Sequence, residues 1–172
     1  KGTTLNFVNE RDDESKVYHS ENGLLDYLSI IAMDNGKNDL VGKPIIVHGE
    51  GTDIVQNQTV TMACNIALGV SKQDKGRVLS FTNTTYNKLG GTHEKGFYNG
   101  CLEIIKHYYR TFETEINSRN KTKIQLINQT NKGVTIDKLF KKRHVANKFY
   151  AIIDMKHDDP ELQPQTKDAL VS

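Results

Sequence analysis

The fold is decided at Gly90-Gly91-Thr92-His93-Glu94-Lys95-Gly96-Phe97, where a predicted strand meets the longest predicted helix. Two adjacent glycines allow the positive φ of a sharp reversal, and Thr92 can cap the first helical turn. Glu94 then places a negative charge near the positive end of the helix dipole. The segment therefore predicts a strand, a tight turn and the start of a helix in succession.

The helix after this turn extends from Glu94 to Ile116, because apolar residues recur at spacings of three and four. Tyr108 and Tyr109 continue this apolar stripe, so we expect them in the core. A polar excursion over 117–133 and a helix carrying Leu139 and Phe140 come next. The strand Phe149–Met155 then precedes a C-terminal loop.

The residues before the turn predict mainly strands. Period-two alternation gives a strand at Val60–Leu68, which we expect to pair in a hairpin with Val78–Phe81. Ile45–His48 predicts a further strand, followed by a loop at Gly49, Gly51 and Asp53. A hairpin of Thr3–Val8 with Lys16–His19 and a helix at Leu24–Ala32, capped by Ser20 or Asn22, begin the chain. Periodicity alone predicts an α+β fold.

Composition indicates one globular domain spanning residues 1–172, with a formal net charge of +2. No apolar run reaches membrane-spanning length, and the first residues lack the apolar core of a signal peptide. Cys64 and Cys101 lie in apolar patterns without metal-ligand spacing, which favours two buried thiols in a reducing compartment. The sequence thus predicts no membrane partner and no metal site.

Two groups of residues are candidates for phosphate contact. Lys167 carries a point charge suited to a terminal phosphate, and Gln165 adds an amide donor, although a solvated surface lysine is the alternative. Basic side chains on the two C-terminal helices can contact DNA phosphates or form a solvated helix face. The possible DNA-facing residues are Lys106, Arg110, Lys141, Lys142 and Arg143.

Several catalytic patterns are absent from the chain. It has no P-loop, no H-E-x-x-H, no G-x-S-x-G and no zinc spacing, and Glu50 alone in a glycine loop is weak support for catalysis. His93 has no carboxylate partner fixed by sequence, so we interpret Gly90, Gly91, Thr92 and His93 as a structural motif. No catalytic residue is therefore predicted in this chain.

Two motifs nevertheless carry a family resemblance. Gly90-Gly91-Thr92-His93 with Gly96-Phe97 resembles the GGTHxxGF signature of the ATPase subunit of type IIA DNA topoisomerases. Gln165-Thr166-Lys167 resembles that family's QTK loop. Tyr18-His19 with Glu21-Asn22-Gly23 is similar to the F/Y-H-x-E-G-G of gyrase-type subunits, so the resemblance runs through nearly the whole chain.

The resemblance implies the transducer domain, the second domain of the B-type subunit of DNA gyrase or topoisomerase IV. The fold it implies is a mixed four-stranded sheet backed by helices, with a left-handed βαβ crossover of the ribosomal-protein or GHMP type. It implies a GHKL ATPase domain upstream that binds ATP and Mg²⁺, and a TOPRIM domain downstream. Gln165 and Lys167 then contact the γ-phosphate of ATP, while a fragment of this kind is inactive alone.

The implied activity is ATP-driven passage of double-stranded DNA by a cytoplasmic, DNA-associated enzyme, with an organelle or a phage-infected cell as other settings. The implied partners are DNA, a breakage-reunion subunit of the gyrase A or topoisomerase IV A type, and a second copy in a self-dimer. Tyr98 follows Gly96-Phe97 where an arginine is common, which weakens a DNA contact at that position. The alternatives are the second domain of a GHKL mismatch-repair ATPase and a stand-alone nucleic-acid-binding module. Gyrase and topoisomerase IV are not distinguished.

Overall fold

The main element of the computed structural model, which describes residues 2–55, 57–119 and 141–160, is a five-stranded mixed sheet. Its order is β5-β6-β9-β7-β8, and β7 and β9 are its one parallel pair of neighbours. The strands are β5 (Leu40–Val55), β6 (Gln58–Ser71), β9 (Phe149–His157), β7 (Val78–Thr82) and β8 (Thr85–Tyr86). The α+β class is confirmed. The four-stranded prediction is wrong by one strand, because the chain reverses after β7 and adds the short β8.

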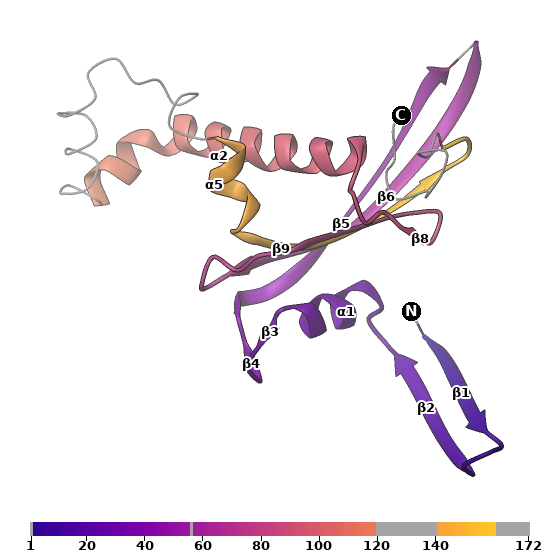
Figure 1. Ribbon diagram of the computed structural model, residues 1–172. Coiled ribbons are helices and arrows are strands. Elements are labelled where there is room, and N and C mark those ends of the chain that lie inside the picture. The colour runs from indigo at the N-terminus through magenta and orange to yellow at the C-terminus, as the bar shows by residue number, and fades with distance from the viewer. Residues whose placement is uncertain (1, 56, 120–140, 161–172) are drawn as a thin grey trace.

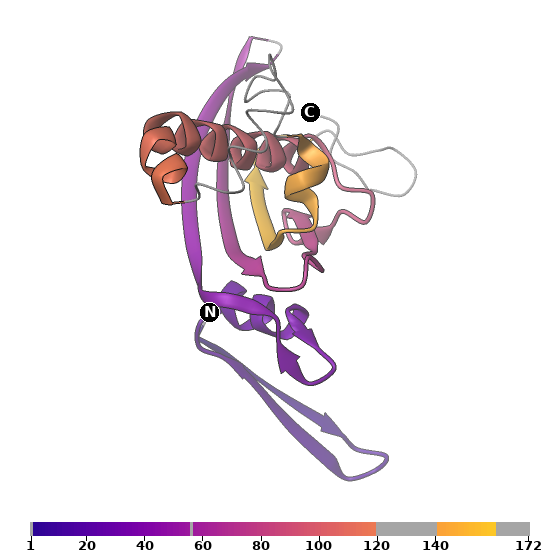
Figure 2. The same ribbon diagram turned by 90° about the vertical axis from the view of Figure 1, so that its left-hand side faces the viewer.

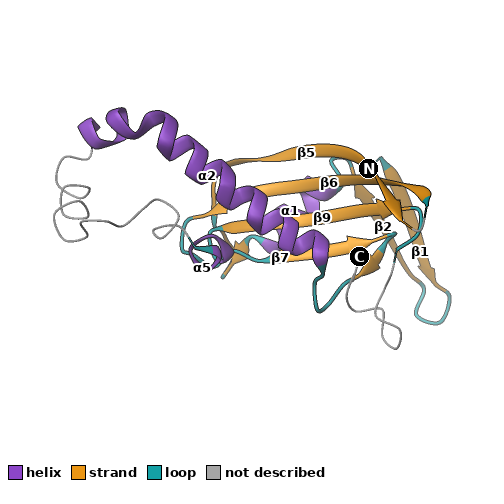
Figure 3. Ribbon diagram, turned by 90° about the horizontal axis from the view of Figure 1, so that it is seen from above, coloured by secondary structure: helices purple, strands orange, loops and turns teal. Residues whose placement is uncertain are grey.

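Helices cover both faces of this sheet (Figures 1 and 3). The helix α1 (Leu24–Ile31) lies on one face. On the opposite face lie α2 (Thr92–Arg119) and α5 (Lys142–Ala146). The sheet is therefore the middle layer of three.

Strand β9 supplies apolar side chains to both layers. Tyr150 and Ile152 pack in the cluster that contains Leu28 of α1. Ala151 and Ile153 pack in the cluster that contains Phe97 of α2. A strand buried on both faces reads as a continuous apolar run, which matches the sequence of β9 and its place inside the sheet.

The predicted hairpin of β6 with β7 is wrong, because β9 lies between them. Strand β6 pairs with β5 on one side and with β9 on the other, Ile66 facing Ile153 across the ladder. Strand β7 pairs in parallel with β9, Val78 facing Ala151. The hairpin prediction relied only on the closeness of β6 and β7 in the sequence. Burial of both faces of β9 favours a place for β9 between these two strands.

The predicted loop at Gly49, Gly51 and Asp53 is also wrong, since β5 continues through it. Gly49 faces Cys64 and Gly51 faces Met62 in the ladder with β6. Backbone hydrogen bonds to β6 hold these residues extended despite their low strand propensity. The register instead shifts between Val41 and Ile45, next to Gly42 with a φ of 73°.

Two small hairpins precede or flank the sheet. The predicted N-terminal hairpin is confirmed as β1 (Thr3–Asn9) with β2 (Glu14–Ser20), and it extends away from the five-stranded sheet (Figure 2). The pair β3 (Met33–Asp34) and β4 (Lys37–Asn38), which sequence reasoning missed, follows α1. The residue at the N-cap of α1 is Gly23 and not the predicted Ser20 or Asn22. Asp26 in the first turn accepts hydrogen bonds from Ser20 Oγ and from the backbone N–H of Asn22, both at 2.9 Å.

The long helix α2 confirms the predicted helix and corrects part of its predicted core. Its backbone kinks at Phe112. Tyr108 is 57% exposed, so the prediction that it lies in the core is wrong.

Cys64 and Cys101 are half-buried free thiols, and burial raises the pKa of Cys64 to about 11. The predicted helix around Leu139 and Phe140 lies outside the described residues.

The connection from β7 to β9 includes β8, α2 and α5 and returns to a parallel neighbour, as a βαβ crossover requires. Its left-handed sense stays a prediction.

Among the helices that the structure describes, none combines the length and apolar character that a membrane span requires.

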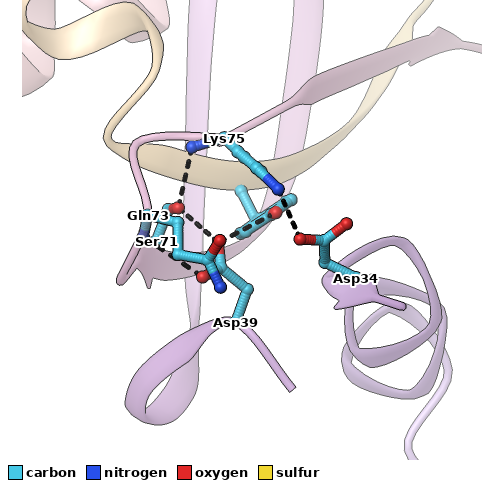
Figure 4. Close-up of polar contacts among 6 residues, drawn as sticks. Asp34, Asp39, Ser71, Gln73 and Lys75 are labelled. Carbon is cyan, nitrogen blue, oxygen red and sulfur yellow. Dashed lines mark hydrogen bonds and ion pairs between the residues drawn. The ribbon is translucent and has the colours of Figure 1, made fainter. Parts of the chain in front are cut away.

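A buried carboxylate joins α1 to the sheet (Figure 4). Asp39, between β4 and β5, is 1% exposed. Its Oδ2 accepts hydrogen bonds from the hydroxyls of Ser71 and Tyr150, the second at 3.0 Å. Its Oδ1 accepts from the backbone N–H of Gln73 at 3.1 Å, and its own N–H donates to the carbonyl of Ala32 at 3.0 Å. Asp39 thereby connects the end of α1 to the end of β6 and the start of β9.

These donors stabilise the ionised carboxyl. The hydroxyl of Ser71 has the largest effect in holding the pKa of Asp39 below its ordinary value, against the opposing effect of burial. The ammonium of Lys75, paired with Asp34 at 2.5 Å, acts in the same direction. Because the folded pKa is depressed, the carboxylate stabilises the fold fully above the unfolded pKa of about 3.9. That stabilisation is lost as the pH falls through the lower folded value.

Replacing this carboxylate should weaken the fold at neutral pH. We expect Asp39→Asn to lower the urea midpoint of unfolding at pH 7, because an amide accepts fewer of the three hydrogen bonds. The difference from the parent should shrink below about pH 4. Asp13→Asn, in the exposed turn of the β1–β2 hairpin, is the control and should leave the midpoint unchanged. Equal midpoints for Asp39→Asn and Asp13→Asn would contradict the role of Asp39.

Candidate functional site at the carboxyl ends of β7 and β9

The two parallel strands of the sheet end side by side. Thr82, the last residue of β7, faces Met155 in β9, and β9 ends two residues later at His157. Ligand sites of α/β proteins form preferentially at the carboxyl ends of parallel strands. The chain that leaves β7 leads to Gly90-Gly91-Thr92-His93, and the chain that leaves β9 leads towards Gln165 and Lys167.

The Gly90 turn confirms the predicted reversal before the helix, but of the two glycines only Gly90 has a positive φ, and Thr92 is the first residue of α2 and not its cap. Gly90 has a φ of 71°, and its N–H donates to the carbonyl of Asn87 at 2.9 Å. Helix α2 begins at Thr92, and the N–H of Lys95 donates to the carbonyl of Gly91 at 3.1 Å. A Cβ atom on Gly90 would lie 2.5 Å from Oε2 of Glu94. Glycine is therefore favoured at position 90 by the backbone conformation, whereas the flexible Glu94 side chain can move away from a Cβ.

Buried polar side chains fix this turn to β7. Ser80, Thr82 and Asn87 are each at most 2% exposed. The N–H of Asn87 donates to the carbonyl of Ser80 at 2.8 Å, and the hydroxyl of Thr82 donates to Oδ1 of Asn87 at 2.8 Å. The hydroxyl of Ser80 also donates to Oε2 of Glu94 at 3.4 Å. The start of the helix is thus held by hydrogen bonds to the strand it follows.

His93 lies at the start of α2 with 8% of its surface exposed. Both ring nitrogens are buried and have no hydrogen-bond partner among the described residues. Burial lowers the pKa of His93, since desolvation disfavours the charged imidazolium. A positive charge at the amino end of a helix is also unfavourable. Both effects favour the neutral form of His93, and its structural role stays a prediction.

The end of β9 is held from two neighbouring elements. Asn83, in the turn after β7, exchanges two side-chain hydrogen bonds with the backbone of His157. The N–H of Thr61 in β6 donates to Oδ2 of Asp158 at 3.2 Å. Sequence reasoning missed Asn83, His157 and Asp158 as site residues.

The basic residues predicted to face DNA differ in their exposure and in their contacts. Lys106 is buried, and its ammonium pairs with Glu103 at 2.8 Å. Arg110 of α2, Lys141 just before α5 and Lys142 at the start of α5 are exposed. The ammonium of Lys142 lies 4.7 Å from the ring centroid of Tyr98. Arg143 belongs to α5. Their contact with DNA stays a prediction.

The remaining predicted site residues, Gln165 and Lys167, lie outside the described ranges 2–55, 57–119 and 141–160. Within those ranges, no group of three His, Cys, Asp or Glu side chains could hold a metal ion. The contact of Gln165 and Lys167 with a phosphate therefore stays a prediction.

Comparison with known proteins gives a family and a fold. The family model described as DNA gyrase B matches residues 23–172. The DNA gyrase B subunit of Streptococcus pneumoniae is 28% identical over 172 residues, covering 99% of this chain and 22% of the relative. The corresponding protein of Metamycoplasma hominis is also 28% identical and is covered to 23%. The chain thus spans about a fifth of the curated relatives it matches.

Two solved structures share the fold. The 43K ATPase domain of Thermus thermophilus gyrase B matches 98% of this chain and is covered to 38%, with a TM-score of 0.62 and 16% identity. The topoisomerase IV ATP-binding domain of Francisella tularensis matches 98% of this chain and is covered to 37%, with a TM-score of 0.58 and 21% identity.

These matches correct one expectation from sequence. The resemblance implied a transducer domain, distinct from the ATPase domain. That assignment is wrong, because the solved structures that match 98% of the chain are described as ATPase or ATP-binding domains. The chain corresponds to a part of the region that those descriptions call the ATPase domain.

Two glycine substitutions test the turn that begins α2. We expect Gly90→Ala to lower the free energy of unfolding by about 1–2 kcal/mol, because a left-handed backbone is costly for residues with a Cβ. Gly100→Ala is the matched control, since it lies within α2 and a Cβ there meets nothing within 4 Å. It should raise stability by about 0.5–1 kcal/mol. Urea unfolding measures both, and a Gly90→Ala protein as stable as the parent would contradict the assigned turn.

Proposed function

The chain belongs to the DNA gyrase B family, and we propose that it forms part of the ATP-hydrolysing unit of a type IIA DNA topoisomerase. In the intact subunit it couples ATP binding and hydrolysis to gate movement and the passage of double-stranded DNA. The family match carries this proposal, because it includes both Gly90-Gly91-Thr92-His93 and Gln165-Thr166-Lys167.

Lys167 and Gln165 supply the contact to the nucleotide in this proposal. The ammonium of Lys167 binds the γ-phosphate of ATP, and the amide of Gln165 donates a second hydrogen bond. Hydrolysis breaks the bond between the γ-phosphate and the rest of the nucleotide. The contact of Lys167 therefore exists with ATP and not with ADP. A difference of this kind can shift a conformational equilibrium, whereas a contact equal in both states cannot.

The described fold supports this role through the parallel pair β7 and β9. Their carboxyl ends coincide, so the segment after His157 starts beside the turn that leads to Gly90. Behind these ends, β9 packs against α1 on one face of the sheet and against α2 and α5 on the other. A movement of Lys167 relative to the nucleotide would therefore be passed to the sheet as a unit.

The partners follow from the proposed activity. They are double-stranded DNA, a breakage-reunion subunit of the gyrase A or topoisomerase IV A type, and a second copy of the subunit. Arg110, Lys141 and Lys142 are the exposed basic residues with which the chain could contact DNA phosphates. A cytoplasmic, DNA-associated location accompanies this proposal.

ATP is the substrate, and Mg²⁺ is the cation that commonly accompanies it. Within the described residues no group of three His, Cys, Asp or Glu side chains could hold a metal ion, so the proposal assigns Mg²⁺ no ligand among them. Their proposed contribution is to position the segment that contacts ATP and to supply positive charge. The family match does not favour the mismatch-repair or stand-alone binding alternatives.

Removing the proposed phosphate contact tests this function. In the intact subunit, we expect Lys167→Ala to slow ATP turnover by about tenfold to a hundredfold, since a hydrogen bond to a charged group contributes about 1.5–3 kcal/mol. Lys43→Ala, an exposed lysine of β5 at the opposite end of the sheet, is the matched control and should keep parental turnover. Turnover unchanged by Lys167→Ala, in a folded subunit, would refute the proposed role.

A further inference from the structure

Strand β5 is an open edge of the five-stranded sheet (Figure 3). It pairs with β6 on one side, and no strand of the described residues pairs with its other side. Its register with β6 is unbroken from Ile45 to Val55, and every residue from Ile45 to Ile54 is exposed. A free edge of this length presents a row of backbone N–H and C=O groups that can pair with another strand.

A lysine, a proline and a register shift protect only the start of β5. Lys43 and Pro44 lie where the register with β6 shifts. Features of this kind disfavour pairing of an edge with another chain. Directly after them, Ile45, Ile46 and Val47 are consecutive apolar residues with exposed fractions of 55%, 47% and 45%. Exposed apolar runs commonly mark interaction sites.

Gly49 and Gly51 continue this strand although nothing within the chain requires glycine there. Neither has a positive φ, and a Cβ atom at either position would meet nothing within 4 Å. The ladder with β6 continues through both glycines without a bulge. Glycine inside a strand often marks a bulge or the close approach of another backbone. With no bulge at these positions, the two glycines leave room for the backbone of a second strand.

Charged side chains lie on the α1 side of this edge. Ile46 lines a pocket with residues of α1, and Val47 lines a pocket with residues of α2, so even-numbered residues of β5 face α1. Nδ1 of His48 is hydrogen-bonded to Oδ1 of Asn65 at 2.9 Å, and its Nε2 to Oε1 of Glu50 at 3.0 Å. The hydrogen bonds to Asn65 and then to Glu50 raise the pKa of His48. The edge therefore carries a histidine that favours its positive form, followed two residues later by a carboxylate.

A two-fold axis through Gly49 would bring opposite charges together between two antiparallel copies of β5. Antiparallel copies of one strand align odd-numbered with odd-numbered residues, because the groups that hydrogen-bond outward alternate along the strand. With the axis at Gly49, His48 of each copy lies opposite Glu50 of the other. Val47 of each copy then lies opposite Gly51 of the other. An axis one residue to either side would place two histidines or two glutamates opposite each other, which is unfavourable.

We propose that the free edge of β5 is a contact surface between two copies of this chain, which pair antiparallel about Gly49 and join their sheets into one. Backbone hydrogen bonds hold the two edges together, and the opposing side chains fix the register. The same patch meets itself, as a two-fold symmetric dimer requires. The inference rests on the second copy of the subunit that the proposed function includes, and it is independent of the nucleotide contact of Lys167.

Single cysteines on this edge test both the contact and its register. In the intact subunit, Cys64 and Cys101 are first replaced by alanine, because Gly49 faces Cys64 within the chain. Gly49→Cys then places a thiol at the axis, opposite its own copy and within reach of a disulfide. Gly51→Cys is the matched control, an equally open glycine on the same face of the strand. Its two copies would lie about 14 Å apart along the paired strands, too far for a disulfide.

The expected result is a cross-link that depends on register. Oxidation with diamide should convert Gly49→Cys to a disulfide-linked dimer with a yield about tenfold or more above that of Gly51→Cys. Val47→Cys alone should link as poorly as Gly51→Cys. A mixture of the Val47→Cys and Gly51→Cys subunits should link well, because these positions face each other across the two copies. Mass spectrometry of the linked peptides identifies the positions joined.

Other outcomes overturn the inference in distinguishable ways. Equal yields for Gly49→Cys and Gly51→Cys would assign the linkage to random collision. Subunits that sediment as dimers but link neither through Gly49→Cys nor in the mixture would exclude the β5 contact and leave the proposed self-dimer intact. Folded subunits that sediment as monomers and do not link would remove both. The mixture keeps the test decisive if Gly49→Cys fails to fold, since it leaves Gly49 unchanged.

Discussion

The parallel pairing of β7 with β9 is the constraint on which the rest of the structure depends. Strand β9 enters the sheet after α2 and α5, far along the chain from β7, and its place between β6 and β7 is set by burial on both faces. Because the two strands run in the same direction, the turn before α2 and the root of the C-terminal segment leave the same end of the sheet. The proposed contact to ATP is built on that coincidence.

Side chains from other elements secure β9 near both of its ends. Near its start, the hydroxyl of Tyr150 donates to the buried Asp39, which also binds the end of β6. At its last residue, His157 exchanges two hydrogen bonds with Asn83. Asp39 joins the strand to the α1 layer, and Asn83 sets the direction in which the chain leaves it. The first contact joins two layers of the fold, and the second fixes the end of β9 to the turn after β7.

Local patterns in the sequence were sufficient for elements whose structure depends on neighbouring residues. The β1–β2 hairpin, α1, the alternating β6 and the start of α2 after Gly90 were all predicted, because turn residues and hydrophobic periodicity act over a few positions. The predictions failed where long-range pairing overrides local preference. Ladder bonds to β6 hold Gly49 and Gly51 extended, and β9 takes the place beside β6 that the sequence suggested for β7. Asn83 and Asp39 were not foreseen, since their partners lie 74 and up to 111 residues away.

Amide hydrogen exchange at the end of β9 tests the central claim most directly. The N–H of His157, bonded to Oδ1 of Asn83, should exchange more slowly when the intact subunit binds a non-hydrolysable ATP analogue than when it binds ADP. This slowing is expected because a contact from Lys167 to the γ-phosphate would restrain the segment rooted at His157. The same exchange rate at His157 with both nucleotides would show that the end of β9 does not respond to the γ-phosphate, which would contradict the account.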